Sequence, residues 1–520
     1  MTTAQVLQTG WVPLSDVPWR ISLFDRDIFW TALAVAVSAV VATAALVVWR
    51  IYVSPASNIP GPAMAGATLW YEFYHWFVKD DWYEHLQALH DRYGPVVRIG
   101  PNEVHFVDHE FCLRLHNRAD LLKCPTYYRP IRDLLGGITD PHRYRQRKAL
   151  MKPLFRGETL SSYASGPMNS LVEALQARLL SEASRGRPTN LTHIMWAFSA
   201  DIMTSYVSGE ALGLGKLEGQ ALVVAHEASR PYGIVHLAAI AHSVPFLMET
   251  VDVFPALRRM TVIGWADKLA STYLTNCGEG ESKEKSQASR DSVGIQLANR
   301  LKDKYLAHEE MTDIILAGAE GLLSNLIFLI HHMEQHPRIM ELLRTELDHF
   351  SRNSCHGRQV WKDSGLLQLE YLDAVVRETT RLSAPWWHRL PRQSPTPVTY
   401  KGHVIPAKVE KVSMSFTLRM LERDPTIFPN AESFIPERWL PSNPDAKRLK
   451  ATSATFGVGN RICLGYELSQ QVLKKALACI IQELDFTICG GPGYLSTYPT
   501  RNKAVNLVAQ LRPRLVSTRE

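Results

Sequence analysis

Ten residues near the C-terminus, from Phe456 to Gly465, constrain the fold of this 520-residue chain more than any other stretch. They read FGVGNRICLG, so that one cysteine, Cys463, and one arginine, Arg461, stand among the three glycines Gly457, Gly459 and Gly465. Glycine has no Cβ atom, and it therefore allows a backbone to turn tightly around a neighbouring side chain. A thiol in such a loop can be deprotonated when backbone N–H groups and a fixed cation lie nearby.

A cysteine thiolate can serve as the axial ligand of haem iron, and it then favours cleavage of the O–O bond of dioxygen. The guanidinium of Arg461 offers a fork of N–H donors that suits a haem propionate. The alternative is a glycine-rich loop around a structural cysteine. That alternative does not explain why the phenylalanine, the arginine, the cysteine and all three glycines occur together at this spacing. The stretch therefore predicts a haem site in which Cys463 ligates the iron and Arg461 contacts a propionate. It resembles the haem-binding signature of the cytochrome P450 family, and this resemblance implies that the cofactor is haem b and that Phe456 and the three glycines also hold it.

The N-terminal part contains an apolar segment without any charged residue, at residues 28–49. As a helix it would be about 33 Å long at ~1.5 Å per residue, which is enough to cross a bilayer. Trp30 and Trp49 stand near its ends, where interfacial aromatic residues are common. We expect a retained transmembrane anchor, because the apolar core of a cleaved signal peptide is shorter; a helix buried in the protein core is the weaker alternative.

The residues that flank this segment suggest its orientation. Arg50 follows directly, whereas the charges before it nearly cancel, so the positive-inside rule favours a body on the cytosolic side. Pro60 and Pro62 fix φ and stop helices. We therefore expect a lumenal segment at residues 1–27, a stiff proline-rich hinge at residues 50–62, and one catalytic domain at residues 63–520.

Charge and cysteine usage narrow the class of protein further. A net charge of +6 is small for this length, so it fits a membrane surface or an acidic protein partner and does not indicate nucleic-acid binding. The seven cysteines have neither metal-ligand nor disulfide-framework spacing, which is typical of a reducing compartment.

Helical periodicity dominates the rest of the chain and predicts a mainly α fold with a smaller β portion. We expect amphipathic helices at residues 82–93, 171–183 and 194–207, and a long buried helix at residues 313–333 with Thr312 as its N-cap. Short strand patterns lie at residues 96–99, 103–106, 398–400 and 404–405. Residues 278–291 are charged and rich in serine, which predicts a surface loop.

The cysteine loop resembles the haem-binding signature of the cytochrome P450 family, and the resemblance runs from Ile59 to the C-terminus. Three further landmarks follow in the order of that family: Ala317–Glu320 resembles the start of its oxygen-binding helix motif, Glu378–Arg381 its E-x-x-R helix, and Phe434–Trp439 its P-E-R-W segment. The resemblance implies the cytochrome P450 fold, preceded here by the transmembrane helix.

The same resemblance implies roles for charged residues. Glu378, Arg381 and Arg438 would form a structural triad that locks the loop carrying the thiolate. Arg392 and Arg461 would hold the haem propionates, together with Lys148, where arginine is commoner in the family. A solvated basic surface remains the alternative for the region of Lys148.

The oxygen-binding motif departs from the family pattern at Gly321, where a threonine usually follows the acidic residue. That hydroxyl normally holds a water and relays protons, and glycine can do neither. Glu320 remains the expected proton source, and Gly321 leaves room for a water or for the substrate. Ser324 or a substrate hydroxyl could replace the missing group.

The resemblance implies a monooxygenase of the endoplasmic reticulum membrane that oxidises a lipophilic substrate with O2. Electrons would come from NADPH through cytochrome P450 reductase, with cytochrome b5 as a further partner, and four cations would meet the acidic reductase surface: Arg145, Arg147, Lys474 and Lys475. Residues 74–80 and 90–99 resemble fungal secondary-metabolite members, notably the trichodiene-oxygenase-like group, which implies a terpenoid or another fused polycyclic product as the substrate. Two alternatives remain: a haem-thiolate enzyme that rearranges, dehydrates or desaturates its substrate without inserting oxygen, and a haem protein without catalytic activity.

Overall fold

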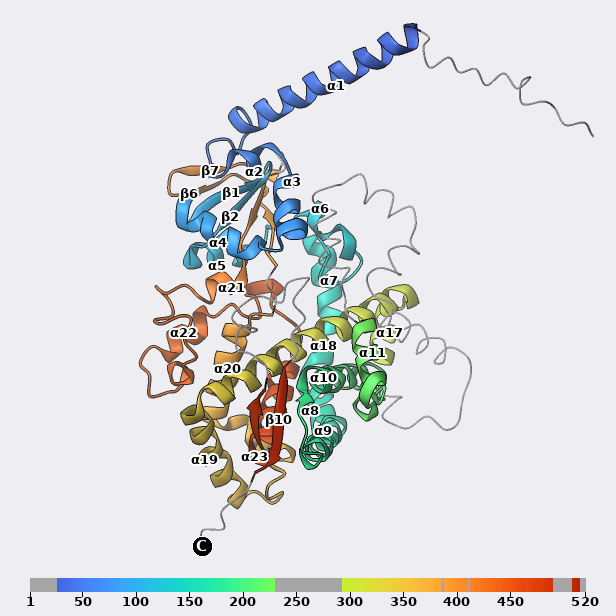
Figure 1. Ribbon diagram of the computed structural model, residues 1–520, viewed down its shortest axis with the longest axis vertical. Helices are drawn as coiled ribbons and strands as arrows, with labels where there is room; N and C mark the ends of the chain where they lie inside the picture. The colour runs from blue at the N-terminus through green and yellow to red at the C-terminus, as the bar shows by residue number, and fades with distance from the viewer. Residues whose placement is uncertain (1–25, 230–291, 386–387, 409–411, 490–506, 515–520) are drawn as a thin grey trace, which may run out of the picture.

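The computed structural model describes residues 26–229, 292–385, 388–408, 412–489 and 507–514 (Figure 1). Most of these residues are helical, and the strands are short, which confirms the predicted mainly α fold. The predicted loop at residues 278–291 and almost all of the predicted lumenal segment lie outside the described residues.

Eighteen α-helices lie in the described ranges: α1 (Arg26–Tyr52), α2 (Ala63–Ala67), α3 (Trp70–Phe73), α4 (Trp82–Tyr93), α5 (His109–Asn117), α6 (Pro125–Tyr128), α7 (Pro141–Met151), α8 (Gly157–Ser165), α9 (Pro167–Ser184), α10 (Leu191–Ser208), α11 (Gly219–Ser229), α17 (Val293–Leu301), α18 (Lys304–Gln335), α19 (Pro337–Asn353), α20 (Glu370–Ser383), α21 (Leu418–Leu421), α22 (Ala446–Thr452) and α23 (Tyr466–Glu483). The three predicted amphipathic helices correspond to α4, α9 and α10.

The strands form three small sheets. The largest has the order β1-β2-β8-β5-β3 and consists of β1 (Val96–Gly100), β2 (Glu103–Phe106), β8 (Ser413–Ser415), β5 (Arg392–Gln393) and β3 (Leu122–Lys123). The second has the order β4-β10-β9, with β4 (Thr189–Asn190), β10 (Val508–Pro513) and β9 (Leu484–Ile488), and the third pairs β6 (Val398–Tyr400) with β7 (His403–Ile405). The four predicted strand segments are therefore confirmed.

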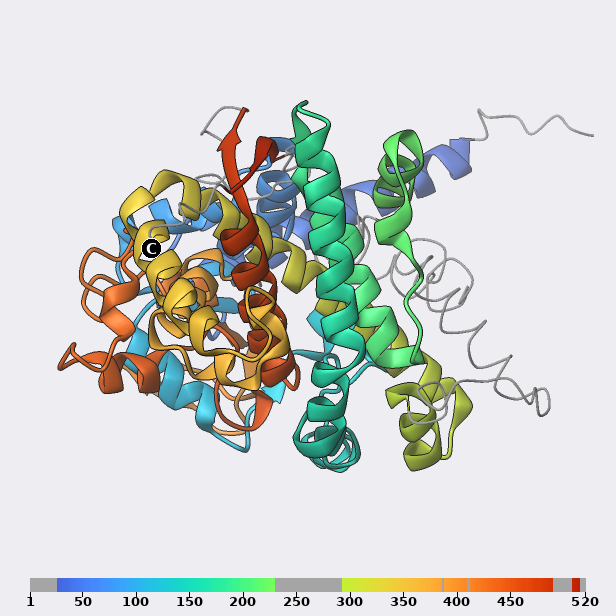
Figure 2. The ribbon, with the colours of Figure 1, turned by 90° about the horizontal axis from the view of Figure 1, so that it is seen from below.

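Helix α18 crosses the middle of the molecule, and α10, α20 and α23 pack against it (Figure 1). Its apolar residues are buried on most sides, as expected for a helix that runs through a core. Helix α23, red in Figure 2, lies against the teal helix α9 and completes this core. The thiolate loop directly precedes α23, so the core fixes where that loop begins and ends.

The predicted start of this central helix is wrong. Helix α18 begins at Lys304, and its N-cap is Asp303, whose side chain accepts a hydrogen bond from the N–H of Leu306. Thr312 lies inside the helix and donates to the carbonyl of His308, one turn back, at 2.9 Å. Ala307 and Met311 are fully buried, so the apolar face extends about two turns further toward the N-terminus than the sequence pattern indicated.

Helix α1 projects from the end of the molecule that holds β1, β2, α2 and α3 (Figure 1). Within its residues 28–52, the most apolar 18-residue window has a mean hydropathy of 2.4 and none of it is buried, so this helix could span a membrane. Helix α18 is also long and apolar enough, but about two thirds of its apolar window is buried inside the protein.

The expected hinge is bonded to the globular part. Helix α1 continues to Tyr52, and Ala56 and Ile59 are buried beyond it. Arg98 of β1 donates to Ser54 Oγ at 3.0 Å, and its backbone N–H donates to the carbonyl of Pro60 at 2.7 Å. These contacts restrict the angle between α1 and the globular part more than a stiff proline-rich linker alone would.

Candidate active site

The cysteine loop folds back on itself as the glycine spacing predicts. Gly457 and Gly459 have φ angles of +75° and +64°, in the left-handed region that favours glycine. A Cβ atom on Gly459 would lie 2.5 Å from Asn117 Oδ1, so the loop also requires a missing side chain there. The N–H of Cys463 donates to the carbonyl of Phe456 at 2.8 Å, which closes the loop.

The surroundings of the sulfur fit a metal-bound thiolate. Burial raises the pKa of the Cys463 thiol, and the N–H of Gly465 opposes this effect by donating toward the sulfur. Asp313 of α18 raises the same pKa and Lys148 of α7 lowers it, so both helices approach the sulfur. Although protein groups surround the thiol on most sides, Cys463 keeps an exposed surface on which a metal ion could replace the thiol proton.

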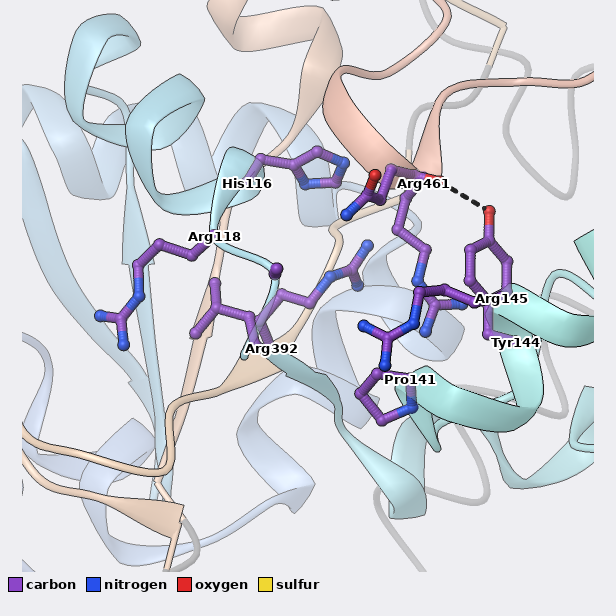
Figure 3. A pocket seen from close by; sticks show the side chains of 10 residues that line it. His116, Arg118, Pro141, Tyr144, Arg145, Arg392 and Arg461 are labelled. Carbon is purple, nitrogen blue, oxygen red and sulfur yellow. Dashed lines mark hydrogen bonds between the residues drawn. The ribbon is translucent and has the colours of Figure 1, made fainter.

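A pocket beside this loop gathers positive charge (Figure 3). Arg461 and Arg392 line it, and the guanidinium of Arg461 lies 3.5 Å from the ring centroid of Tyr144. Burial, with a contribution from the nearby charge of Arg392, lowers the pKa of Arg461 to about 10. The lining includes two more arginines, Arg118 and Arg145, and no carboxylate. This donor set fits the anionic propionates of a haem.

Helix α7 contacts the cysteine loop through two side chains. Tyr144 Oη donates to the carbonyl of Asn460 at 3.0 Å (Figure 3), and Lys148 Nζ donates to the same carbonyl. Burial lowers the pKa of Lys148, and the nearby positive charge of Arg461 also lowers it. The ammonium group of Lys148 therefore contacts the backbone of the cysteine loop.

One cation of this region was missed by sequence reasoning. Lys123 of β3 lies opposite Arg392 of β5, and its Nζ donates to the carbonyl of Gly136. Burial lowers the pKa of Lys123 well below its usual value, and the charges of Arg392 and Arg461 lower it further. No motif surrounds Lys123 in the sequence, so only the pairing of two distant strands reveals it.

The three residues of the expected triad lie together and are buried. Arg381 donates to both carboxylate oxygens of Glu378, at 2.9 and 2.8 Å, and Arg438 Nε donates to Glu378 Oε1 at 3.1 Å. Trp439 Nε1 and the N–H of Ile435 also donate to this carboxylate, at 2.8 and 3.0 Å. Arg381 Nη1 further reaches backbone carbonyls at residues 422 and 431. This cluster therefore fixes the chain segment that leads to the cysteine loop.

Sequence reasoning assigned no role to Glu422, yet its carboxylate is fully buried below the same segment. It accepts hydrogen bonds from Ser453 Oγ at 3.1 Å and from the N–H of Ala454, two residues before Phe456. Glu422 thus anchors the segment that enters the cysteine loop. The sequence alone could not reveal this role, because Glu422 and Ser453 are 31 residues apart and only the fold brings them together.

Replacing Glu422 with glutamine should change how stability depends on pH. Burial raises the pKa of Glu422 from 4.5 to about 7, so between these values the folded protein binds more protons than the unfolded chain. The free energy of unfolding should therefore fall as pH rises through this window. Glu422→Gln should remove this pH dependence. Its free energy of unfolding should exceed that of the wild type by on the order of 2 kcal/mol at pH ~8, and the two should be similar at pH ~5.

Denaturant unfolding of the two proteins at both pH values measures this difference. The matched control is Glu432→Gln, because the side chain of Glu432 is 76% exposed and pairs with Arg423 at the surface. Parallel pH profiles for Glu422→Gln and the wild type would contradict the assignment.

Three of the four cations expected at a reductase surface are buried instead. Lys474 pairs with Asp373 at 2.8 Å, and Lys475 Nζ donates to Asn169 Oδ1 at 2.6 Å. Arg147 pairs with the buried Glu310 at 2.9 Å. These three predictions are wrong, because each side chain points into a helix contact that the sequence pattern did not indicate. Arg145 alone of the four is exposed.

The expected oxygen-activation residues of α18 lie where one glycine, Gly318, is packed against another helix and the next, Gly321, is not. A Cβ atom on Gly318 would lie 2.4 Å from Met203 Cε, so this glycine allows α10 to pack closely. A Cβ atom on Gly321 would have no neighbour within 4 Å. Glu320 and Ser324 are both partly exposed next to it. The helix therefore leaves open space beside Gly321, as the missing side chain predicts.

Comparisons with known proteins agree with this site. The sequence profile described as Cytochrome P450 matches residues 62–507. The chain is 26% identical to Cytochrome P450 monooxygenase oblB of Cochliobolus heterostrophus, over 84% of this chain and 86% of the relative. It is 27% identical to Cytochrome P450 monooxygenase BOT1 of Botryotinia fuckeliana, over 89% and 91%. It is also 27% identical to Tryptophan 6-hydroxylase fscE of Fusarium equiseti, over 85% and 88%.

The match covers most of the chain and includes the thiolate loop, the buried Glu378 cluster and the arginine-lined pocket. Relatives named as monooxygenases span the same length. This protein belongs to the cytochrome P450 family and is a fungal-type cytochrome P450 monooxygenase.

Proposed function

We propose that this monooxygenase is anchored in the endoplasmic reticulum membrane and oxidises a lipophilic secondary metabolite, with a terpenoid as the favoured substrate class. The observation that supports it most is the cysteine loop beside a pocket lined by arginines, in a chain whose α1 could span a membrane. NADPH-derived electrons would arrive through cytochrome P450 reductase, with cytochrome b5 as a further partner. The catalytic domain would face the cytosol.

The residues of the site would divide the work as follows. A haem whose iron is ligated by the cysteine thiolate would supply dioxygen activation when it is bound. Cys463 would ligate the iron, and the N–H of Gly465 would stabilise the thiolate. Arg461 and Arg392 would neutralise the propionates, with Lys148 at the edge of the same region.

On the substrate side, Glu320 would hold a proton for the reaction, because it is the acidic residue that precedes Gly321. The open space beside Gly321 would admit a water or a substrate hydroxyl as the second proton donor. The membrane anchor suits a substrate that partitions into the bilayer.

The name of one relative, Tryptophan 6-hydroxylase, supports oxygen insertion but not the terpenoid class. The resemblance to trichodiene-oxygenase-like proteins favours a terpenoid. A second function, rearrangement, dehydration or desaturation without oxygen insertion, is favoured by Gly321, where the usual proton-relaying threonine is missing.

Product mass under isotopically labelled dioxygen separates these functions. The full-length protein, a cytochrome P450 reductase and NADPH would be incubated with a panel of sesquiterpenes and other polycyclic metabolites. Oxygen insertion predicts a product that gains one labelled oxygen atom. A product that has lost water or hydrogen, or an isomer of the substrate, would support the second function and contradict the first.

Restoring the threonine should improve coupling of NADPH consumption to product. The space beside Gly321 accepts a side chain without a clash, so Gly321→Thr should fold. If a proton relay is missing, the yield of product per NADPH should rise, because one positioned acid–base group speeds the step that it assists by about 10²–10⁴-fold. Unchanged yield would show that a different group already supplies the proton, and abolished product would show that substrate occupies the space.

A further inference from the structure

Helix α18 is weakened where the oxygen-activation residues lie. It carries two glycines three residues apart, Gly318 and Gly321, and glycine in a helix interior costs about 0.5–1 kcal/mol relative to alanine. At Gly318 the side chain of Met203 fills the place of the missing Cβ, whereas at Gly321 no atom lies within 4 Å of that place. Side-chain packing therefore does not hold the backbone at Gly321.

A side-chain amide holds this backbone instead. Asn325, which is 2% exposed, donates from Nδ2 to the carbonyl of Gly321 at 2.7 Å. A carbonyl can only accept, so the amide group of Asn325 must present its nitrogen to Gly321. In an α-helix this carbonyl is also the acceptor for the backbone N–H of Asn325, four residues later.

The other end of the amide is fixed as well. Ser383 Oγ donates to Asn325 Oδ1 at 2.6 Å, and both side chains are buried. Ser383 is the last residue of α20, the helix that carries Glu378 and Arg381, and its carbonyl accepts from Arg419 Nη1 at 3.3 Å. A continuous chain of hydrogen bonds thus links the helix that supports the cysteine loop to the carbonyl of Gly321.

We propose that Asn325 and Ser383 are positioning residues, which together hold the α18 backbone at Gly321 in the conformation required for dioxygen activation. This inference rests on the proposed haem-thiolate function and deepens it. Hydrogen bonds in a low-dielectric interior are strong and leave little conformational freedom. The pair therefore restricts the backbone at Gly321, as the packing of a side chain at position 321 would otherwise do.

Carbon monoxide bound to the reduced holoenzyme is the probe, because its C–O stretching frequency reports the polar groups and conformations on the substrate side. Asn325→Leu should change the intensity ratio of the infrared C–O bands about fivefold relative to the wild type. This is the change in conformer ratio that corresponds to the loss of one net hydrogen bond. Ser383→Ala should act in the same direction and less strongly. The double variant should match Asn325→Leu, since Ser383 acts through Asn325.

Asn353→Leu is the matched control, because Asn353 Nδ2 also donates to a carbonyl four residues earlier, that of His349, but on the exposed end of α19. Its C–O bands should equal those of the wild type. Unchanged bands in both Asn325→Leu and Ser383→Ala would overturn the inference. If Asn325→Leu does not retain haem, Ser383→Ala decides alone. Absence of a thiolate-type carbon monoxide spectrum in the wild type would instead overturn the proposed function.

Discussion

Replacing Glu378 with alanine should destabilise the protein by about 3–5 kcal/mol, the cost of removing one partner from a buried ion pair. The carboxylate is fully buried, and its loss leaves the Nε of Arg381 and the Nε of Arg438 without their carboxylate acceptor. Because Arg381 also holds backbone carbonyls of the following segment, the cysteine loop should lose its support and haem content should fall. Denaturant unfolding and haem absorbance per protein measure both effects.

A surface ion pair on another helix provides the control. Glu110 lies 3.7 Å from Arg114, one turn along α5, and both side chains are more than two thirds exposed. Glu110→Ala should cost less than about 0.5 kcal/mol and leave the haem content unchanged. Equal effects of the two substitutions would show that the Glu378 cluster has no special part in supporting the loop.

Replacing Cys463 with alanine should abolish monooxygenation, with a loss of about three orders of magnitude or more in turnover. Alanine offers no ligand atom, and no other described residue of the loop has a thiol. The arginine-lined pocket is unchanged by the substitution, so part of the haem should still bind. Product formation and haem content, measured on the same preparation, separate the loss of chemistry from the loss of the cofactor.

Cys355→Ala is the control for this substitution, since Cys355 is an exposed free thiol far from the loop in sequence. It should leave both turnover and haem content at wild-type values. Retained turnover in Cys463→Ala would mean that a different residue ligates the iron.

The sequence predicted those parts of the site in which local spacing determines the geometry. Gly457 and Gly459 allow the tight turn that the motif predicted, and Glu378 and Arg381 share one helix face because they are three residues apart. The strand segments around β1 and β2 were also predictable, because their patterns are short and bounded by turn residues. The start of α18 was missed, since residues 304–312 mix charged and apolar side chains and only tertiary burial of Ala307 and Met311 reveals the face.

Contacts between distant segments left no sequence signal. Arg147 and Glu310 are 163 residues apart, and Asn325 and Ser383 are 58 apart, so neither pair could be recognised before the helices were placed. Lys474 and Lys475 looked like surface cations, because lysine is seldom buried. In the structure their ammonium groups are satisfied by Asp373 and Asn169, which shows how long side chains bury their stems when a partner is present.

The absorbance spectrum of the reduced wild-type protein under carbon monoxide tests the central claim most directly. Coordination of haem iron by the thiolate of Cys463 predicts the strongly red-shifted Soret maximum that is diagnostic of a sulfur ligand. A Soret maximum at the position typical of a nitrogen ligand or a neutral thiol, in protein that is folded and contains haem, would contradict the account.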